Sequence, residues 1–189
     1  MPTAHAQHFH HGATSMPSRA DSDVPPTVTP TLTVVVPDEA ALAPLARRLA
    51  ATMPARAFVA LEGDLGAGKT TFVKAVAAAI GIDPTDVVSP TFGLIHVHDV
   101  PTAHDRPTPE VPDRLVHADL YRVSGAGDLA EIGWDDATAG RCWVFIEWPS
   151  RASKAMPADR LDIAISIDSA TARTFQLTPR GTFTWPTPP

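Results

Sequence analysis

The fold is decided by one stretch of the sequence, Gly63-Asp64-Leu65-Gly66-Ala67-Gly68-Lys69-Thr70. It matches the phosphate-loop pattern G-x-x-x-x-G-K-[ST] at every fixed position. The glycines allow a tight turn in which successive backbone N–H groups point at a polyphosphate. Lys69 is placed to reach the β- and γ-phosphates, and the Thr70 hydroxyl to join the coordination shell of Mg²⁺. The stretch therefore predicts binding of a nucleoside triphosphate together with magnesium.

The residues on either side of this loop predict the strand and the helix that the motif requires. Residues 57–61, before the loop, form a short apolar run typical of a buried parallel strand. After the loop, apolar residues recur at helical spacing, namely Phe72, Val73, Val76, Ala77 and Ile80, and Gly81 follows as a stop signal. Strand, loop and helix in this order are the context of a phosphate loop, which disfavours a chance match in a Gly-rich turn.

Composition narrows the class of protein. A chain of 189 residues with 44% hydrophobic content is long enough for one globular domain with a core. A formal net charge of −6 argues against nucleic-acid binding as the main activity, so we expect no DNA partner. The single Cys142 lies in an apolar run, where we expect a buried structural thiol. Without a possible internal disulfide or a membrane-length apolar segment, the chain is predicted to be cytoplasmic.

Three regions are expected along the chain. Residues 1–30, rich in Pro, Thr, Ser and His, are predicted to be a disordered N-terminal tail. Residues 31–180 form the predicted phosphate-loop (P-loop) domain, and residues 181–189 a C-terminal tail. Within the domain, residues 99–113 carry four prolines and predict a mobile surface loop.

The predicted secondary structure alternates between strands and helices. Strands are expected at residues 32–36, 57–61, 93–98, 115–118 and 142–146, with a C-terminal hairpin of residues 161–167 and 171–177. A first helix is expected from Asp38, and Pro44 should give it a kink or an irregular first turn. A second helix is expected after the phosphate loop, and one or two short helical pieces around Gly133. This pattern predicts an α/β fold: a mostly parallel sheet flanked by helices, with antiparallel C-terminal strands.

Two acids stand where a ligand is expected, at the carboxyl ends of parallel strands. Asp119 ends the strand at 115–118, and Glu147 ends the strand at 142–146. A magnesium-triphosphate site needs a carboxylate at such a place. We expect Asp119 to serve the metal and Glu147 the attacking water or the metal shell, although the division of roles stays open. The alternative for each is an ordinary carboxylate facing solvent.

Weaker candidates surround these residues. The tetrapeptide Ser89-Pro90-Thr91-Phe92 follows the phosphate-loop helix, where a Thr can sense the γ-phosphate, but Ser-Pro also opens plain turns. Trp148 is expected either to pack against the nucleotide base or to belong to the core. Arg122 and Arg151 are possible charge stabilisers, although exposed arginines are common.

Taken together, these pieces resemble the bacterial TsaE family, also called YjeE. The resemblance covers about residues 32–180 and rests on the phosphate loop with Thr71 and on four further motifs, Ser89-Pro90-Thr91-Phe92, His117-Ala118-Asp119-Leu120-Tyr121-Arg122, Glu131-Ile132-Gly133-Trp134-Asp135 and Ile146-Glu147-Trp148-Pro149. The Asp-Leu-Tyr-Arg and Glu-Trp-Pro elements make it specific, because the phosphate loop alone is shared by very many proteins. The long N-terminal tail and the Pro-rich loop depart from the family pattern without touching a motif.

The resemblance implies an ATPase that supports formation of threonylcarbamoyladenosine in tRNAs reading codons that begin with A. It implies the partners TsaB and TsaD, with tRNA contacted only indirectly through that complex. Carried over by motif, Lys69 and Thr70 bind phosphate and magnesium, and Thr71 supports the nucleotide site. Asp119 serves the metal, and Glu147 and Trp148 line the site. The catalytic residues expected on this basis are Glu147, Lys69 and Thr91.

Three other functions are compatible with a phosphate loop. A small-molecule kinase is the main alternative, but such enzymes usually carry an Arg-rich lid and an acceptor-binding domain that this sequence lacks. A GTP-dependent switch would carry an Asn-Lys-x-Asp element after the loop, and none is present. The third is a nucleotide-gated binding module, in which hydrolysis is incidental. It would differ from the ATPase in that loss of hydrolysis would leave tRNA modification intact.

Overall fold

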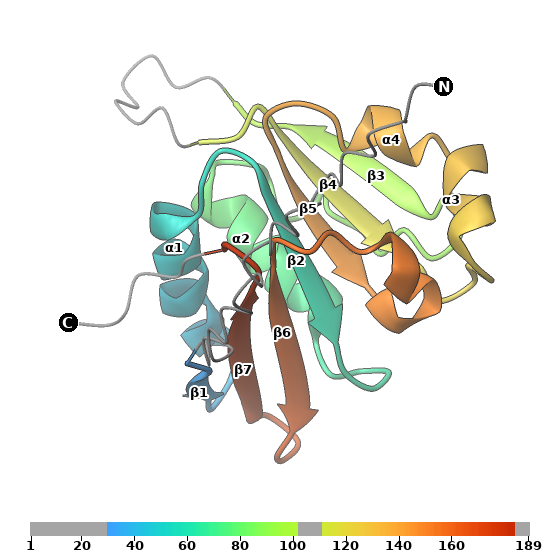
Figure 1. Cartoon of the computed structure of the whole chain (residues 1–189). Coiled ribbons are helices and arrows are strands. Elements are labelled where there is room, and N and C mark those ends of the chain that lie inside the picture. The colour runs from blue at the N-terminus through green and yellow to red at the C-terminus, as the bar shows by residue number, and fades with distance from the viewer. Residues whose placement is uncertain (1–29, 102–110, 184–189) are drawn as a thin grey trace, which may run out of the picture.

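The computed structural model describes residues 30–101 and 111–183. The predicted N-terminal tail, most of the Pro-rich loop and most of the C-terminal tail lie outside the described residues. The described chain forms a seven-stranded sheet in the order β1-β7-β6-β2-β5-β4-β3, with helices on both of its faces (Figure 1). Across both described ranges, no helix has the length and apolar character needed to cross a membrane.

The elements follow the predicted order. The strands are β1 (Leu32–Val36), β2 (Ala57–Glu62), β3 (Ile95–Asp99), β4 (Arg114–Asp119), β5 (Cys142–Glu147), β6 (Arg160–Ile167) and β7 (Arg173–Arg180). The α-helices are α1 (Leu42–Thr52), α2 (Lys69–Ala79), α3 (Ala126–Glu131) and α4 (Trp134–Ala137). Two 3₁₀ segments, η1 (Glu39–Ala41) and η2 (Pro149–Ala155), complete the set.

The centre of the sheet is parallel and its two edges are antiparallel. β4, β5, β2 and β6 pair in parallel in that spatial order, whereas β3 pairs antiparallel with β4 and β7 pairs antiparallel with β6 and β1. The predicted α/β class with a mostly parallel core is therefore confirmed. The C-terminal hairpin is antiparallel within itself, but its first strand joins the parallel core.

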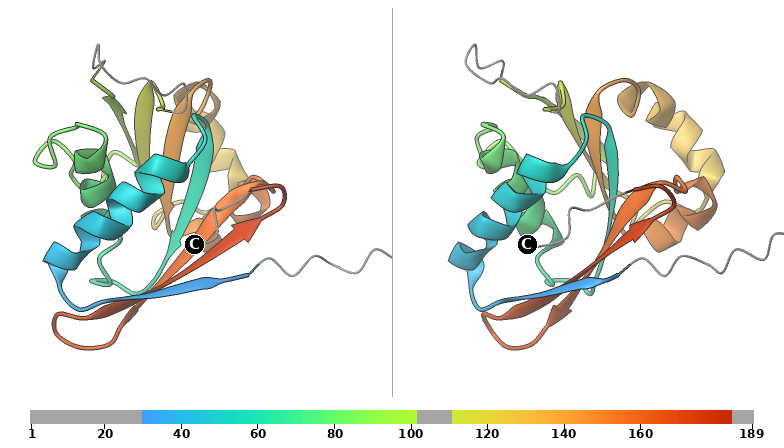
Figure 2. Two further views of the ribbon diagram at one scale, coloured as in Figure 1. Left: turned by 90° about the vertical axis from the view of Figure 1, so that its left-hand side faces the viewer. Right: turned by 60° about the vertical axis from the view of Figure 1, so that its left-hand side comes forward.

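Helices cover the sheet from both sides, as predicted. α1 and α2 lie on one face, and α3, α4 and η2 lie on the other (Figure 2). Side chains of β5 alternate between these layers: Trp143 and Phe145 belong to the α1–α2 core, and Val144 and Ile146 to the opposite core. Because β5 is buried on both faces, its sequence is an unbroken apolar run. Cys142 is fully buried in the second core, as expected for a structural thiol.

Local sequence signals explain several element boundaries. Asp38 caps the η1 turn by accepting the amide of Ala41 at 3.0 Å. Pro44 then falls in the first turn of α1, where the backbone N–H would have no intrahelical acceptor. The helix predicted from Asp38 begins instead with the 3₁₀ turn η1, which confirms the predicted irregular first turn. β3 begins at Ile95, two residues later than predicted, because Leu94 has a left-handed φ of +63°. β7 extends past its predicted end and includes Pro179. Pro179 lies beyond the part of β7 that pairs with β1, so the side of β7 that faces β1 tolerates the missing N–H there.

Candidate nucleotide-binding site

The phosphate loop connects β2 to α2 and turns as the motif requires. The amide of Ala67 donates to the carbonyl of Asp64 at 3.1 Å, and Gly68 caps α2 with a φ of +102° that disfavours other residues. A side chain at Gly63 would lie 2.6 Å from the Ile165 carbonyl, so glycine lets the loop pack against β6. The first turn of a helix leaves its amide hydrogens without intrahelical acceptors, which makes this end of α2 suited to an anion.

Lys69 is buried and held against its own loop. Its Nζ donates to the carbonyls of Gly63 at 2.7 Å and Asp64 at 3.0 Å, and it lies 3.9 Å from the ring centroid of Trp148. Burial lowers the pKa of this ammonium below its ordinary value, against the opposing attraction of Glu147 and other nearby carboxylates. A bound phosphate would offer the ammonium a full negative charge in place of two carbonyl dipoles.

Trp148 follows β5 with a left-handed φ of +58°. This turn directs the half-buried indole over Lys69 and within 5.2 Å of the Tyr121 ring. The expectation of a core tryptophan is therefore wrong, because the residue lies at the site and keeps part of its surface exposed. Its predicted contact with a nucleotide base stays a prediction.

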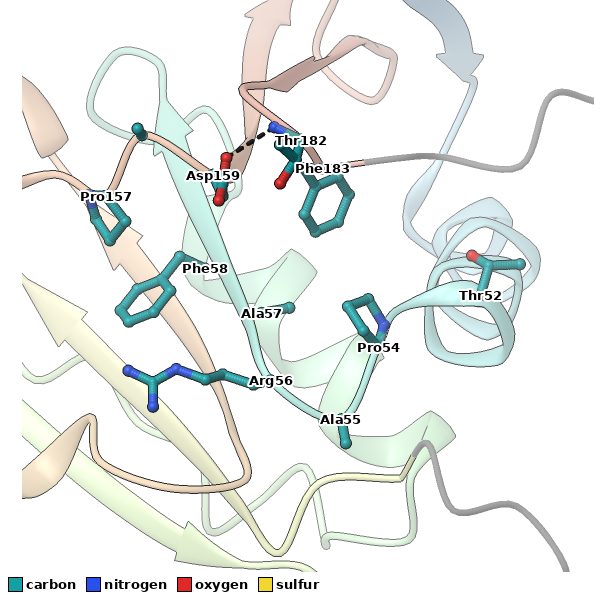
Figure 3. A pocket seen from close by; sticks show the side chains of 11 residues that line it. Thr52, Pro54, Ala55, Arg56, Ala57, Phe58, Pro157, Asp159, Thr182 and Phe183 are labelled. Carbon is teal, nitrogen blue, oxygen red and sulfur yellow. Dashed lines mark hydrogen bonds between the residues drawn. The ribbon is translucent and has the colours of Figure 1, made fainter.

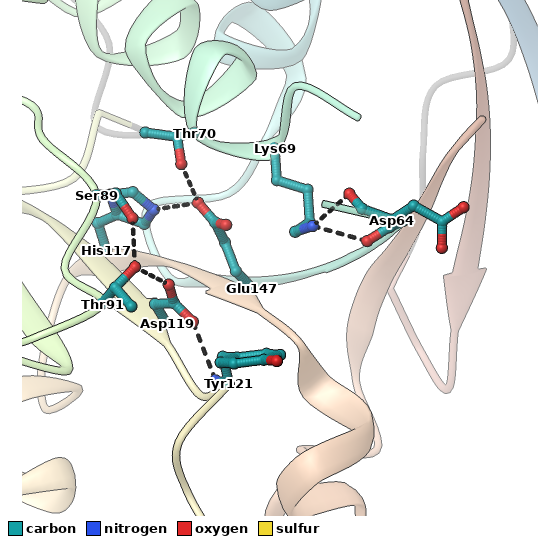
Figure 4. Close-up of polar contacts among 10 residues, drawn as sticks. Asp64, Lys69, Thr70, Ser89, Thr91, His117, Asp119, Tyr121 and Glu147 are labelled. Atoms are coloured by element: carbon teal, nitrogen blue, oxygen red, sulfur yellow. Dashed lines mark hydrogen bonds and ion pairs between the residues drawn. The ribbon is translucent and has the colours of Figure 1, made fainter. Parts of the chain in front are cut away.

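Glu147 joins β5 to the phosphate loop. In the register of the sheet it pairs with Leu61 of β2 and Asp119 of β4, so both predicted acids lie at one level beside the loop. Glu147 Oε1 accepts a hydrogen bond from the Thr70 hydroxyl at 2.7 Å (Figure 4). The same oxygen lies 2.8 Å from His117 Nε2. Thr70 and Glu147 are 77 residues apart in sequence, and the parallel sheet brings them into contact.

Asp119 holds the segment predicted to be a switch. Its Oδ2 accepts from the Thr91 hydroxyl at 2.6 Å, and its Oδ1 accepts from the Tyr121 amide at 3.0 Å. Ser89 and Thr91 share a further hydroxyl contact of 2.8 Å (Figure 4). The alternative of a carboxylate facing solvent is wrong for both acids, since Asp119 is 3% and Glu147 4% exposed.

These oxygens fit a magnesium ion shared with a nucleotide. The Thr70 hydroxyl, Glu147 and Asp119 belong to neighbouring elements and carry oxygen atoms of the kind that Mg²⁺ prefers. Magnesium usually takes only one or two carboxylates from a protein and completes its shell with phosphate and water. Among the residues described, no group of three or more His, Cys, Asp or Glu side chains is suited to holding a metal.

Two residues of the site had no role assigned from the sequence. His117 is fully buried and contacts Glu147, and its Nδ1 has no hydrogen-bond partner within the described chain. Arg173, at the start of β7, donates from Nε to the Ala67 carbonyl at 3.2 Å. A polar residue inside an apolar strand was an available signal for His117, whereas nothing local marks Arg173.

Arg122 and Arg151 lie beside exposed aromatic rings. The Arg122 guanidinium is 4.5 Å from the centroid of Phe92, and that of Arg151 is 5.3 Å from Tyr121. Both arginines are exposed, and Tyr121 also contacts Trp148. Their predicted part in charge stabilisation stays a prediction.

Two cavities lie at opposite ends of β2. A small one of about 250 Å³ adjoins the loop and is lined by residues including Gly66, Gly68, Thr71, Arg173 and Phe175. A larger one of about 890 Å³ surrounds the start of β2 and is lined by Pro54, Arg56, Phe58 and Phe183, among others (Figure 3). Cavity size therefore does not locate the phosphate loop.

Comparison with known proteins identifies the family. The model of the family "Threonylcarbamoyl adenosine biosynthesis protein TsaE" matches residues 36–175. The chain is 36% identical over 121 residues to the protein of that name from Streptomyces coelicolor, covering 64% of this chain and 76% of the relative. It is 35% identical over 109 residues to the Treponema pallidum protein, covering 58% and 72%.

A solved structure agrees with this assignment. The crystal structure of YdiB from Bacillus subtilis superposes with a TM-score of 0.61 at 27% identity, covering 81% of this chain and 88% of that one. The family model spans the phosphate loop, both buried acids and the Ser89–Phe92 segment. The chain belongs to the TsaE family.

Proposed function

We propose that this protein binds and hydrolyses Mg-ATP, and that hydrolysis supports threonylcarbamoyladenosine formation in tRNA together with TsaB and TsaD. The observation that carries the proposal is the 2.7 Å bond from Thr70 to Glu147, which joins the phosphate loop to a buried acid. A Gly-rich turn with a structural role alone does not require a buried carboxylate such as Glu147 against its last residue, Thr70. Burial of a carboxylate is costly, and Glu147 contacts Thr70 and His117 through Oε1 alone, so a cationic partner at the site would compensate the charge further.

Nucleotide binding would exchange contacts that Lys69 already makes. Its Nζ would leave the Gly63 and Asp64 carbonyls for the β- and γ-phosphates, while the amides at the start of α2 hold the phosphate oxygens. The nucleoside would extend past Thr71 into the small cavity beside the loop. This places the indole of Trp148, which lies over Lys69, at the phosphate end of the ligand.

Hydrolysis would use the two buried acids in different ways. Mg²⁺, when bound, would neutralise the charge on the β- and γ-phosphate oxygens. Asp119 and Thr70 would hold it, and Thr91 would respond through its bond to Asp119. Glu147 Oε1 is engaged by Thr70 and His117, so its Oε2 would accept a proton from the attacking water. His117 would keep the carboxylate oriented.

Family membership supports the proposed partners. Relatives carry the name of tRNA threonylcarbamoyladenosine biosynthesis proteins. We infer that this chain works in the cytoplasm as a subunit beside TsaB and TsaD, and reaches tRNA only through them. Its net charge of −6 disfavours strong tRNA binding by the chain alone, because nucleic-acid affinity depends on cationic contacts to phosphate.

The test combines calorimetry with a product assay. The full chain should bind ATP at millimolar magnesium and release inorganic phosphate slowly, and TsaB with TsaD should increase that rate. Absence of ATP binding would refute the proposal at its first step. Transfer of labelled γ-phosphate to a metabolite rather than to water would instead favour a small-molecule kinase.

A further inference from the structure

We propose that Arg173 is a positioning residue for the phosphate loop, and that it sets nucleotide affinity from the side opposite the acids. The inference rests on the proposed ATP binding and assigns part of that binding to the β6–β7 hairpin. No motif of the sequence includes Arg173, and its side chain reaches the loop only because β7 begins beside it.

The Arg173 guanidinium connects the loop to the hairpin turn. Its Nε donates to the Ala67 carbonyl at 3.2 Å, and its Nη2 reaches the Gly66 carbonyl at 3.5 Å. Its Nη1 donates to the carbonyls of Ser169 and Ala172, both at 2.9 Å. One half-buried side chain therefore ties together backbone segments that are 106 residues apart in sequence.

This contact orients an amide that faces the ligand. In a planar trans peptide, the carbonyl of one residue and the N–H of the next point in opposite directions. A carbonyl of Ala67 held toward Arg173 therefore turns the Gly68 N–H away from Arg173. The preceding amide, that of Ala67, is already used within the loop by the Asp64 carbonyl. Arg173 thus selects the loop conformation in which Gly68 offers its N–H to an anion.

Arginine has the chemistry for this role. Its planar group carries five donors in a rigid fork and keeps its charge, whereas lysine offers one flexible ammonium. The same guanidinium lines the small cavity together with Thr71, so it would also add positive charge near a nucleotide bound there. The hairpin meets the loop at a second point, where Gly63 packs against the Ile165 carbonyl. Hairpin and loop are therefore joined at two points.

The experiment compares R173Q and R173K with wild type in the full chain. Calorimetry with ATP at millimolar magnesium should give a Kd raised by about tenfold for R173Q, the effect of losing charged hydrogen bonds to the loop. R173K keeps the charge but cannot span both pairs of carbonyls, so it should recover only part of the affinity. R180Q is the matched control, because Arg180 lies on the same strand and pairs with Asp162, and it should bind ATP as wild type does.

Thermal unfolding distinguishes positioning from a purely structural role. R173Q should show a smaller ATP-induced rise in Tm than wild type. The difference should persist in a buffer in which the ligand-free R173Q variant has the same Tm as the ligand-free wild type. A wild-type Kd for R173Q, or full recovery of affinity in R173K, would overturn the inference while leaving the proposed ATP binding intact. Failure of the wild-type chain itself to bind ATP would overturn both.

Discussion

The phosphate loop lies between two halves of the sheet that contact it in different ways. On one side, β4 and β5 present buried side-chain acids, with Glu147 bonded to Thr70 and Asp119 bonded to Thr91. On the other side, the β6–β7 hairpin meets the loop backbone, through the hydrogen bond from Arg173 and the close packing of Gly63. The proposed hydrolysis would therefore depend on one part of the fold, and the shape of the loop on another. Substitution of an acid should therefore reduce hydrolysis without an equal loss of ATP binding.

The largest expected effect is on hydrolysis alone. Glu147→Gln keeps the shape and one acceptor oxygen but removes the base, so single-turnover phosphate release should fall by about 1,000-fold. ATP affinity should change little. Glu62→Gln is the matched control, since Glu62 ends the neighbouring strand β2 but is exposed. Unchanged phosphate release in the Glu147 variant would assign the base elsewhere and make the acidic half a binding element.

Next in size is the loss of binding on removal of the loop lysine. Lys69→Ala deletes the charge expected on the β- and γ-phosphates, and ATP affinity measured by calorimetry should fall by about 100-fold. Lys74→Ala on the same helix serves as the control, because Lys74 stands outside the motif. Equal affinities for the two variants would contradict the assignment of this loop as the phosphate site.

A smaller effect is expected at the second acid. Asp119→Asn should raise the magnesium concentration needed for half-maximal hydrolysis by about tenfold, because a neutral amide is a weaker ligand for the metal shell. Excess magnesium should restore most of the rate, which separates this variant from Glu147→Gln. Asp99→Asn is the control, because Asp99 ends β3 beside Arg114, at the end of β4 opposite to Asp119. A rate that magnesium cannot rescue would make Asp119 the base instead.

The smallest effect concerns the contact between Asp119 and the Ser89–Phe92 segment. Thr91→Val removes one hydroxyl bond while keeping the shape, and hydrolysis should fall by about threefold to tenfold. Thr91→Ser retains the hydroxyl and should behave nearly as wild type in the same phosphate-release assay. Equal activity of the valine and serine variants would show that the segment is a plain turn.

Prediction from the sequence succeeded where a residue's surroundings are local. Asp119 and Glu147 were identifiable because each ends an apolar strand, and carboxyl ends of parallel strands meet at one edge. Their division of roles stays a prediction, and the sequence did not indicate which of the two carboxylates contacts Thr70. His117 was missed because a single His in an apolar strand gives no hint of which face it occupies. Arg173 was missed because its contact depends on where β7 begins beside a loop far earlier in the chain.

Local sequence patterns were enough to identify the phosphate loop, the order of strands and helices, and the resemblance to the family. Those features depend on backbone conformation and side-chain periodicity within a few residues, which neighbouring amino acids control directly. The contacts of Glu147 with Thr70, of Thr91 with Asp119 and of Arg173 with the loop backbone arise only when the chain is folded. These contacts depend on the lateral order and register of strands, which burial of two separate cores sets across the whole sheet.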